Sequence, residues 1–197
     1  MSDPADRRPV FYYDLGSPYS YLSAERMQSV MPDGVVPVWQ PILLGGIWQP
    51  SDGRSWGVTE TKEENQREIE RRAREYGLMP LRWPDGWPNN TLKAMRAAVF
   101  AQQAGRVVAY SLAAFRQAFA GGQDLSDENF VLMAAAACEL HPNAVLKALE
   151  TQSVKDRLRD QTAEAYERGV RGVPTIAIGA ELFYGDDRLE DAAAALR

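Results

Sequence analysis

The amino-acid sequence predicts an α/β fold with strands near both ends of the chain and helices in the middle. Short apolar runs with strand-like composition occur at residues 10–15, 35–39, 175–178 and 181–184, whereas residues 59–169 repeat apolar side chains at helical spacing. The predicted order is therefore strand–helix–strand, a helical block, and strand–strand–helix. One α/β core with a helical insertion fits this order better than two separate domains.

The first part of the chain is predicted to form a right-handed parallel crossover. Residues 10–15 are apolar and aromatic, which indicates a buried strand. Ser17 is a favourable N-cap, and Pro18 suits the first helical position because it lacks the N–H that would be unpaired there. In the second strand, residues 35–39, Pro37 removes one ladder hydrogen bond and so predicts a place at the edge of the sheet.

The middle of the chain is predicted to be almost entirely helical. Residues 61–64 match a capping box, Gly77 is suited to closing that helix, and Asn90 is suited to capping the next one. Helices are expected over 62–76, 91–103, 107–120, 126–140, 143–150 and 153–168.

The last part returns to strands. Gly179-Ala180 predicts a tight hairpin between the two final strands, and a helix is expected from residue 185 to the end. The predicted organisation is a discontinuous thioredoxin-like domain, residues 1–58 and 170–197, interrupted by an α-helical insertion over residues 59–169.

Composition excludes several classes of protein. The net charge of −5, with no dense run of Lys or Arg, argues against a nucleic-acid partner. No apolar stretch reaches the roughly 20 residues needed to cross a bilayer, and the polar start of the chain predicts no signal peptide. Cys138 is the only cysteine, so no internal disulfide can form and a cytoplasmic location is expected. His141 is the only histidine, and without a Cys or carboxylate cluster nearby it is interpreted as a surface or cap residue, not a metal ligand.

Two short motifs far apart in the sequence predict where chemistry takes place. Ser17 opens the first helix, and Val173-Pro174 precedes the third strand. A helix N-terminus that faces a cis-proline loop is the active-site arrangement of the thioredoxin fold, so the pair predicts that fold and a cis Val173–Pro174 bond. Taken singly, Ser17 is explained as an N-cap, and Pro174 as an ordinary trans proline at a strand entry.

Ser17 carries a hydroxyl where redox members of this fold carry a thiol, so dithiol chemistry is not expected. The positive end of a helix stabilises a thiolate, and a serine hydroxyl can donate a hydrogen bond to the sulfur of a bound small-molecule thiol. Because His141 lies in the helical block, a Ser–His hydrolase has little support.

Asp186 and Asp187 follow the last strand, at the same end of the predicted sheet as Val173. Acidic residues in the first turn of a helix are expected from the helix dipole alone. In the alternative interpretation, an aspartate there binds the ammonium of a γ-glutamyl group, while backbone N–H groups bind its carboxylate.

Three blocks of sequence, in order along nearly the whole chain, carry a family resemblance. They are Phe11–Asp14 with Ser17–Leu22, Asn90–Leu92 with Arg96, and Gly172–Thr175 with Leu182–Arg188. Together they resemble the 2-hydroxychromene-2-carboxylate isomerase and kappa-class glutathione transferase group of the DsbA-like superfamily.

The resemblance implies a thioredoxin fold with a helical insertion, present as a homodimer. It also implies a thiol cofactor, glutathione or another low-molecular-weight thiol, with its sulfur at Ser17. The cysteinyl backbone would pair with Val173 beside cis Pro174, and the γ-glutamyl end would lie near Asp186 and Asp187.

The function that the resemblance implies is glutathione-dependent isomerisation of 2-hydroxychromene-2-carboxylate or a related aromatic-degradation intermediate. The thiolate adds reversibly to the conjugated substrate, permits rotation, and leaves. Trp48 and Asn90 are candidate substrate-pocket residues, and Trp56, Trp83 and Trp87 either add to the pocket wall or pack under loops. The alternatives are a kappa-like transferase or peroxidase acting on another electrophile, and a non-redox DsbA-like binding domain.

Three details of the resemblance concern single contacts. Residues 45–54 contain no Asn, where kappa-type proteins carry one after the second strand. Lys62 is a candidate for a ligand-side charge. Asn90 and Arg96 either support the pocket or cap and anchor their helix, and the second account is preferred.

Overall fold

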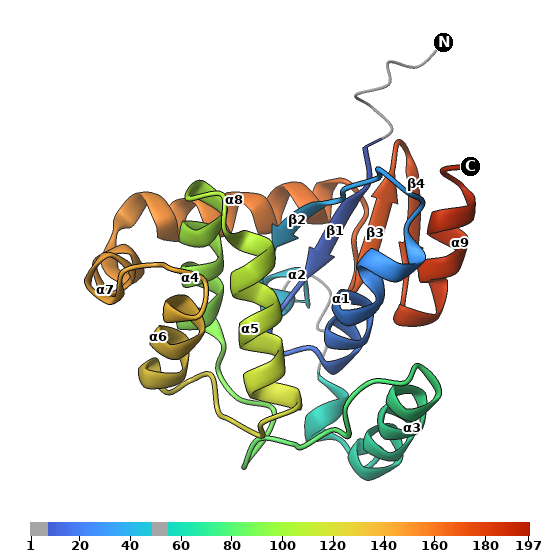
Figure 1. Cartoon of the computed structure of the whole chain (residues 1–197), viewed down its shortest axis with the longest axis horizontal. Helices are drawn as coiled ribbons and strands as arrows, with labels where there is room; N and C mark the ends of the chain where they lie inside the picture. Colours follow the sequence, from blue (N-terminus) through green and yellow to red (C-terminus); the bar gives the residue numbers. More distant parts are fainter. Residues whose placement is uncertain (1–7, 49–54) are drawn as a thin grey trace.

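A computed structural model describes residues 8–48 and 55–197 of the chain. Within these residues four strands form one mixed sheet in the order β2-β1-β3-β4 (Figure 1). β1 runs parallel to β2 and antiparallel to β3, and β3 runs antiparallel to β4. The strands are β1 Val10–Tyr13, β2 Val38–Pro41, β3 Thr175–Ile178 and β4 Glu181–Tyr184.

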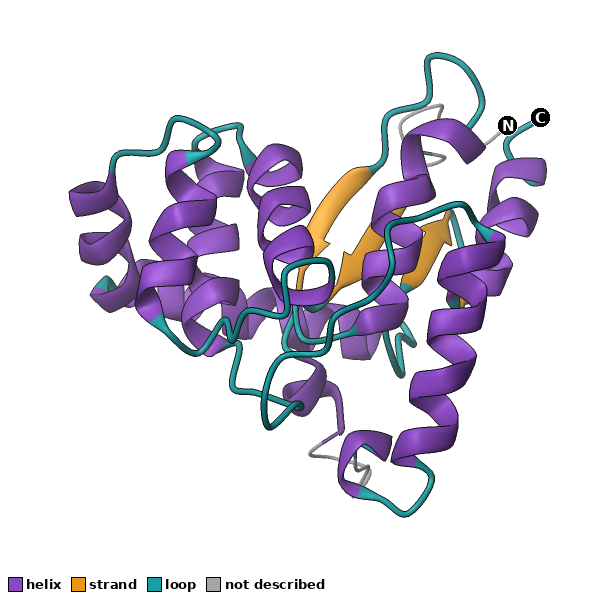
Figure 2. Ribbon diagram, turned by 60° about the horizontal axis from the view of Figure 1, so that its bottom comes forward, coloured by secondary structure: helices purple, strands orange, loops and turns teal. Residues whose placement is uncertain are grey.

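The described helices cover both faces of the sheet and extend beside it. They are α1 Pro18–Val30, α2 Leu44–Trp48, α3 Lys62–Glu75, α4 Leu92–Gln103, α5 Val107–Phe119, α6 Glu128–Ala136, α7 Pro142–Glu150, α8 Gln152–Glu167 and α9 Leu189–Ala194. Short 3-10 helices occupy Trp56–Val58 and Asp186–Arg188. Helices α4 to α8 gather beside β2, whereas α3 stands apart from them near α1 (Figures 1 and 2).

The alternation of side chains along β1 divides the core between the two faces. Phe11 and Tyr13 point to the face covered by α1 and α9, where the larger apolar cluster lies. Tyr12 points to the opposite face, where Ile47 of α2 and Ala165 of α8 pack in a second cluster. Because successive strand side chains alternate, one short strand supplies both cores.

Several local predictions are confirmed. The third and fourth strands occupy the predicted residues, and β2 lies at the sheet edge, as Pro37 predicts. Gly77 ends α3 with a φ of 68°, a conformation that glycine adopts without steric cost. His141 caps α7, its Nδ1 accepting from the Asn143 N–H at 3.2 Å.

Other local predictions are wrong in instructive ways. β2 begins at Val38 rather than Val35, because the Val35 N–H bonds back to Pro32 in a turn that needs Gly34 at a φ of 79°. The capping box does not form: the hydroxyl of Thr61 makes no cap bond and pairs with Thr59 and Asn65 instead. The helix expected over 126–140 shortens to Glu128–Ala136, and the final helix stops at Ala194. α2 was not predicted, because Gly45-Gly46 opposes helix formation.

Candidate active site

Ser17 lies where β1 ends and α1 begins. It is the N-cap of α1, and its Oγ accepts a hydrogen bond from the Ser20 N–H at 3.2 Å. The side chain is 5% exposed. The Oγ therefore sits at the positive end of a 13-residue helix, where a neighbouring anion is stabilised.

The proline loop faces Ser17 directly. The Val173–Pro174 peptide bond is cis, as predicted, and the Ser17 hydroxyl donates to the Val173 carbonyl oxygen at 3.5 Å. The N–H of Val173 has no hydrogen-bond partner among the described residues. The structure thus brings together the two motifs that the sequence separates.

A cavity of about 570 Å³ opens beside this pair. It is lined by four segments: the turn after β1, the region of α2, the loop before α4 and the end of β4. Its aromatic side chains are Tyr19, Trp48, Trp56, Trp87 and Tyr184. An aromatic wall beside a hydroxyl at a helix N-terminus suits an apolar planar ligand with one polar or ionised end.

Trp87 is the best fixed of these aromatic residues. Its ring centroid lies 4.8 Å from that of Trp56 and 5.1 Å from that of Trp83. Its indole N–H donates to the Gly16 carbonyl at 3.2 Å, so the ring is tied to the turn that carries Ser17. A Cβ on Gly57 would lie 2.6 Å from the Trp87 ring, which explains a glycine at that position.

The four tryptophans considered from the sequence divide into two roles. Trp48, Trp56 and Trp87 line the cavity, whereas Trp83 packs behind them and donates its indole N–H to Glu70 at 2.8 Å. Lys62 donates to the carbonyl of Trp87, so it braces this loop.

Asn90 lines the cavity at the start of α4. Its Oδ1 accepts from the Leu92 N–H at 2.9 Å, so the residue satisfies the first N–H of α4 and also faces the cavity. The N-cap position is Thr91, whereas the sequence predicts Asn90. Arg96 instead donates to the Leu149 carbonyl at 3.3 Å and anchors α4 to α7. The residues beyond Trp48 in the stretch without Asn, 49–54, lie outside the described part of the chain.

Asp186 and Asp187 have different surroundings. Asp186 is 1% exposed, and its carboxylate accepts from Arg72 at 2.8 Å and from the Tyr76 hydroxyl at 3.1 Å. Burial raises the pKa of Asp186, and the charge of Arg72 and the Tyr76 hydrogen bond lower it. The Asp187 carboxylate is 60% exposed and lies 4.0 Å from Arg72. Neither aspartate lines the cavity beside Ser17; of the two, Asp187 is open to a ligand.

Three residues at the site were missed in the sequence. Asp14 is a buried carboxylate that lines the cavity, and burial raises its pKa while hydrogen bonds from Gly16, Leu44 and Thr91 lower it. Tyr19 and Tyr184 both line the cavity, and Tyr184 is 64% exposed at its mouth. A carboxylate directly after a buried strand, three positions before Ser17, was the available signal for Asp14.

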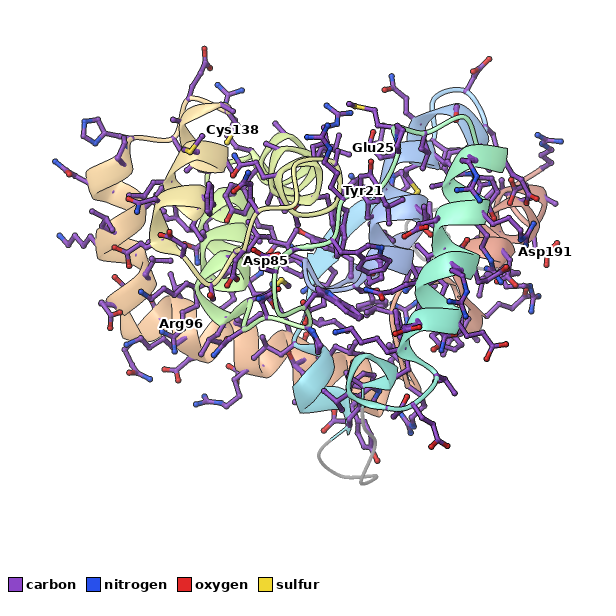
Figure 3. All side chains as sticks on the ribbon, turned by 90° about the horizontal axis from the view of Figure 1, so that it is seen from below. Tyr21, Glu25, Asp85, Arg96, Cys138 and Asp191 are labelled. Carbon is purple, nitrogen blue, oxygen red and sulfur yellow. The ribbon has the colours of Figure 1, made fainter. Side chains whose placement is uncertain are left out.

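The remaining chemistry-bearing groups lie away from this cavity. Cys138 is buried in the helical block (Figure 3), and burial raises the pKa of its thiol. Among residues 8–48 and 55–197, no cluster of three or more His, Cys, Asp or Glu side chains could hold a metal ion. Within the same described ranges, no helix combines the length and apolarity needed to cross a membrane.

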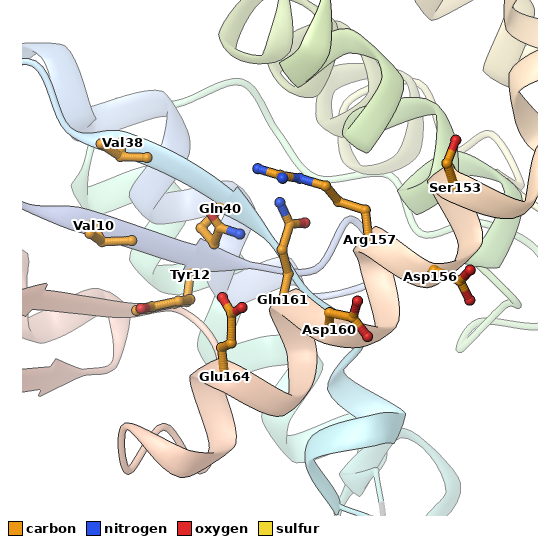
Figure 4. A pocket seen from close by; sticks show the side chains of 10 residues that line it. All are labelled: Val10, Tyr12, Val38, Gln40, Ser153, Asp156, Arg157, Asp160, Gln161 and Glu164. Carbon is orange, nitrogen blue, oxygen red and sulfur yellow. The ribbon is translucent and has the colours of Figure 1, made fainter.

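A second cavity, of about 630 Å³, lies between α8 and the face of β1 and β2 that carries Tyr12 (Figure 4). Its floor is Val10, Tyr12 and Val38, and Gln161 and Arg157 project over it from α8. It contains neither Ser17 nor the proline loop. The candidate active site is therefore the smaller cavity, which joins a helix N-terminus, a cis-proline loop and an aromatic wall.

The fold and site define a class: the chain belongs to the DSBA-like thioredoxin domain family, which matches residues 10–197. Among characterised relatives, it is 27% identical over 191 residues to the 2-hydroxychromene-2-carboxylate isomerase of Sphingobium xenophagum, covering 91% of this chain and 93% of that protein. It is 24% identical over 204 residues to glutathione S-transferase kappa 1 of Rattus norvegicus, covering 95% and 89%. A solved 2-hydroxychromene-2-carboxylate isomerase superposes with a TM-score of 0.87 at 26% identity, covering 95% of this chain and 93% of the other.

Proposed function

We propose that the protein is a glutathione-dependent isomerase acting on 2-hydroxychromene-2-carboxylate or a related aromatic-degradation intermediate. The supporting observation is the approach of the Ser17 hydroxyl, at the start of α1, to the cis Val173–Pro174 loop beside an aromatic cavity. Similarity to 2-hydroxychromene-2-carboxylate isomerases over more than nine-tenths of the chain supports the substrate class.

In this proposal the glutathione sulfur occupies the space beside Ser17. The 3.5 Å contact between Ser17 and the Val173 carbonyl is at the upper limit of a hydrogen bond, so the hydroxyl can turn to the sulfur at little cost. A hydrogen bond to a charged sulfur contributes about 1.5–3 kcal/mol. At about 1.4 kcal/mol per unit, that bond lowers the thiol pKa by roughly one to two units.

The proline loop would orient the tripeptide. The unpartnered Val173 N–H and the Val173 carbonyl, which Ser17 would release, can pair with the cysteinyl backbone as a neighbouring strand would. Asp187, with its exposed carboxylate, would bind the γ-glutamyl ammonium. Asp186 would hold Arg72 in place beside Asp187, because Arg72 contacts both carboxylates.

The reaction needs no net transfer of atoms. When bound, the thiol would supply reversible nucleophilic addition to a conjugated double bond of the substrate, which would let that bond rotate before the double bond is restored. The protein contributes an ionised, positioned thiol and an aromatic wall of Tyr19, Trp56 and Trp87 that holds the ring during rotation.

The test is glutathione binding by calorimetry, with the thiolate followed by its ultraviolet absorbance as pH is varied. Ser17→Ala is expected to raise the pKa of bound glutathione by about one to two units and to weaken binding at neutral pH about tenfold. Ser29→Ala is the matched control, because Ser29 lies on the same helix but its hydroxyl bonds only the Arg26 carbonyl. Unchanged binding in Ser17→Ala, or no binding in the wild type, refutes the proposal.

Similarity to kappa-class transferases over 95% of this chain supports a second candidate, conjugation or peroxide reduction by the same thiol. A substrate panel in which isomerised product and glutathione conjugate are quantified separately distinguishes the two activities. The proposal includes a cytoplasmic homodimer; light scattering of the purified protein tests the dimer.

A further inference from the structure

Asp14 is a buried carboxylate that the proposed chemistry does not use. It is the residue after β1, is 6% exposed, and lines the cavity floor next to Gly16 and Ser17. A buried carboxylate is stable only when hydrogen bonds replace the water it has lost. The positions of its hydrogen-bond donors therefore indicate the structural role of Asp14.

Three donors from three separate segments bind this carboxylate. Its Oδ1 accepts from the Gly16 N–H at 2.8 Å and from the Thr91 hydroxyl at 3.0 Å, and its Oδ2 accepts from the Leu44 N–H at 2.9 Å. The donors lie 2, 30 and 77 residues away in sequence. One side chain thus joins the α1 turn, the start of α2 and the start of α4.

Each segment contributes a different part of the cavity. The α1 turn carries Ser17, whose N–H also bonds the Asp14 carbonyl at 3.0 Å. Leu44 begins α2, a five-residue helix containing two glycines that is too short to be stable alone. Thr91 is the N-cap residue before α4 and follows Asn90 at the cavity wall. Under the proposed function, the first segment borders the thiol and is called the thiol side of the cavity, and the other two border the substrate and are called the substrate side.

The arrangement requires a carboxylate. Both backbone donors, on Gly16 and Leu44, are N–H groups that cannot accept, and they bind different oxygens. An asparagine would place its NH₂ against one of these N–H groups and leave that donor unpaired. The hydroxyl of Thr91 makes no cap bond to the α4 backbone and instead donates to the Asp14 carboxylate.

We propose that Asp14 is a positioning residue that couples the thiol side of the cavity to the substrate side through these three hydrogen bonds. Because of this coupling, a change in the position of α4 or α2 alters the position of Ser17, and a change at Ser17 alters the position of α4 and α2. The catalytic readouts below rest on the proposed function, whereas the exchange measurement does not.

The first arm measures amide hydrogen exchange in the full chain without ligand. Asp14→Asn is expected to increase exchange at least about tenfold at the Gly16 amide or the Leu44 amide, whichever one faces the new NH₂ group and loses its acceptor. Asp127→Asn is the matched control: Asp127 caps α6 by accepting from the Asn129 N–H at 2.9 Å, away from the cavity. Unchanged exchange at both Gly16 and Leu44 in Asp14→Asn overturns the proposal.

The second arm is a double-mutant cycle on turnover and on glutathione affinity. Asp14→Asn is expected to lower kcat/KM by up to about 100-fold, the scale of a 1 Å misplacement. Thr91→Val is expected to weaken glutathione binding although Thr91 lies on the substrate side. Thr91→Ser, which keeps the hydroxyl, should restore it. In the Asp14→Asn background Thr91→Val should add almost nothing, because the bond it removes is already disturbed.

The outcomes separate the two proposals. Additive effects of the two substitutions on kcat/KM overturn the coupling while leaving the glutathione-dependent function standing. Absence of glutathione binding in the wild type overturns the proposed function, and the exchange arm then decides the role of Asp14 unaided.

Discussion

Removing Arg72 should destabilise the protein far more than neutralising its partner Asp186. Arg72→Met leaves a carboxylate that is 1% exposed without the Arg72 cation, while the Tyr76 hydroxyl bond and a backbone hydrogen bond remain on it. Asp186→Asn leaves Arg72 with Glu68 at 2.9 Å and Asp187 at 4.0 Å, on a side chain that is 23% exposed. The two substitutions break the same ion pair, but only the first strands a buried charge.

The magnitudes follow from that asymmetry. Breaking a buried pair by removing one partner costs about 3–5 kcal/mol, and the remaining Tyr76 bond favours the lower end, about 3 kcal/mol for Arg72→Met. At about 2–4 °C per kcal/mol for a chain of this length, the melting temperature should fall by about 6–12 °C. Asp186→Asn should cost about 1 kcal/mol, the usual net value of a hydrogen bond.

The cost of Arg72→Met should depend on pH. Burial raises the pKa of Asp186 above its ordinary value of 3.8, and without Arg72 that pKa rises further. Below the folded-state pKa of Asp186 in the wild type, the carboxyl is protonated in both folded proteins, so the lost cation matters little. The cost grows as pH rises through that pKa, and it levels off above the higher folded-state pKa of Asp186 in Arg72→Met.

Urea unfolding followed by tryptophan fluorescence measures these free energies, with an unchanged m-value required for the comparison. Arg67→Met is the control, because Arg67 lies on the same helix, is 71% exposed, and is 3.7 Å from Glu63. It should change the free energy of unfolding by less than about 0.5 kcal/mol. If Asp186→Asn proves as costly as Arg72→Met, or if the cost does not vary with pH, the reasoning is wrong.

Three further substitutions or probes address the cavity and the helical block. Gly172→Ala places a Cβ 2.6 Å from the Tyr184 ring, and this exposed ring can move away from it. We expect kcat/KM to fall while the melting temperature changes by less than about 3 °C. An unchanged kcat/KM with a large fall in melting temperature would refute a role for Tyr184 at the cavity mouth. Gly57→Ala meets the buried Trp87 ring at 2.6 Å and should cost about 1–3 kcal/mol of stability with a shift in tryptophan fluorescence; an unaltered urea midpoint would contradict the packing. Cys138 should react with a thiol reagent only after denaturation, since it is buried and burial raises its pKa; rapid reaction in the native state would count against this.

The parts of the fold that the sequence predicted are those with local causes. Strand composition placed β3 and β4, because apolar and β-branched side chains suit a buried, pleated surface. β2 does lie at the predicted sheet edge, but Pro37 precedes the strand, so its missing N–H is not the cause of that position. Ser17 was recognised as an N-cap for a similarly local reason. The pairing of Ser17 with the cis Val173–Pro174 bond was also anticipated, from the two motifs and the active-site arrangement of the thioredoxin fold.

The sequence could not show which hydrogen-bond partner each polar group has. Asp186 and Asp187 are adjacent and chemically alike, yet Arg72, 114 residues away from Asp186, binds the Asp186 carboxylate and leaves Asp187 exposed. The sequence also could not show that Asp14 connects three segments, because one of its hydrogen-bond donors, Thr91, lies 77 residues away along the chain. The Ser17 cap and the helix end at Gly77 depend on a few bonds near one residue, so the sequence reveals them, whereas the capping box predicted at residues 61–64 does not form. Burial and hydrogen-bond occupancy depend on which distant segments meet, and that is a property of the folded chain alone.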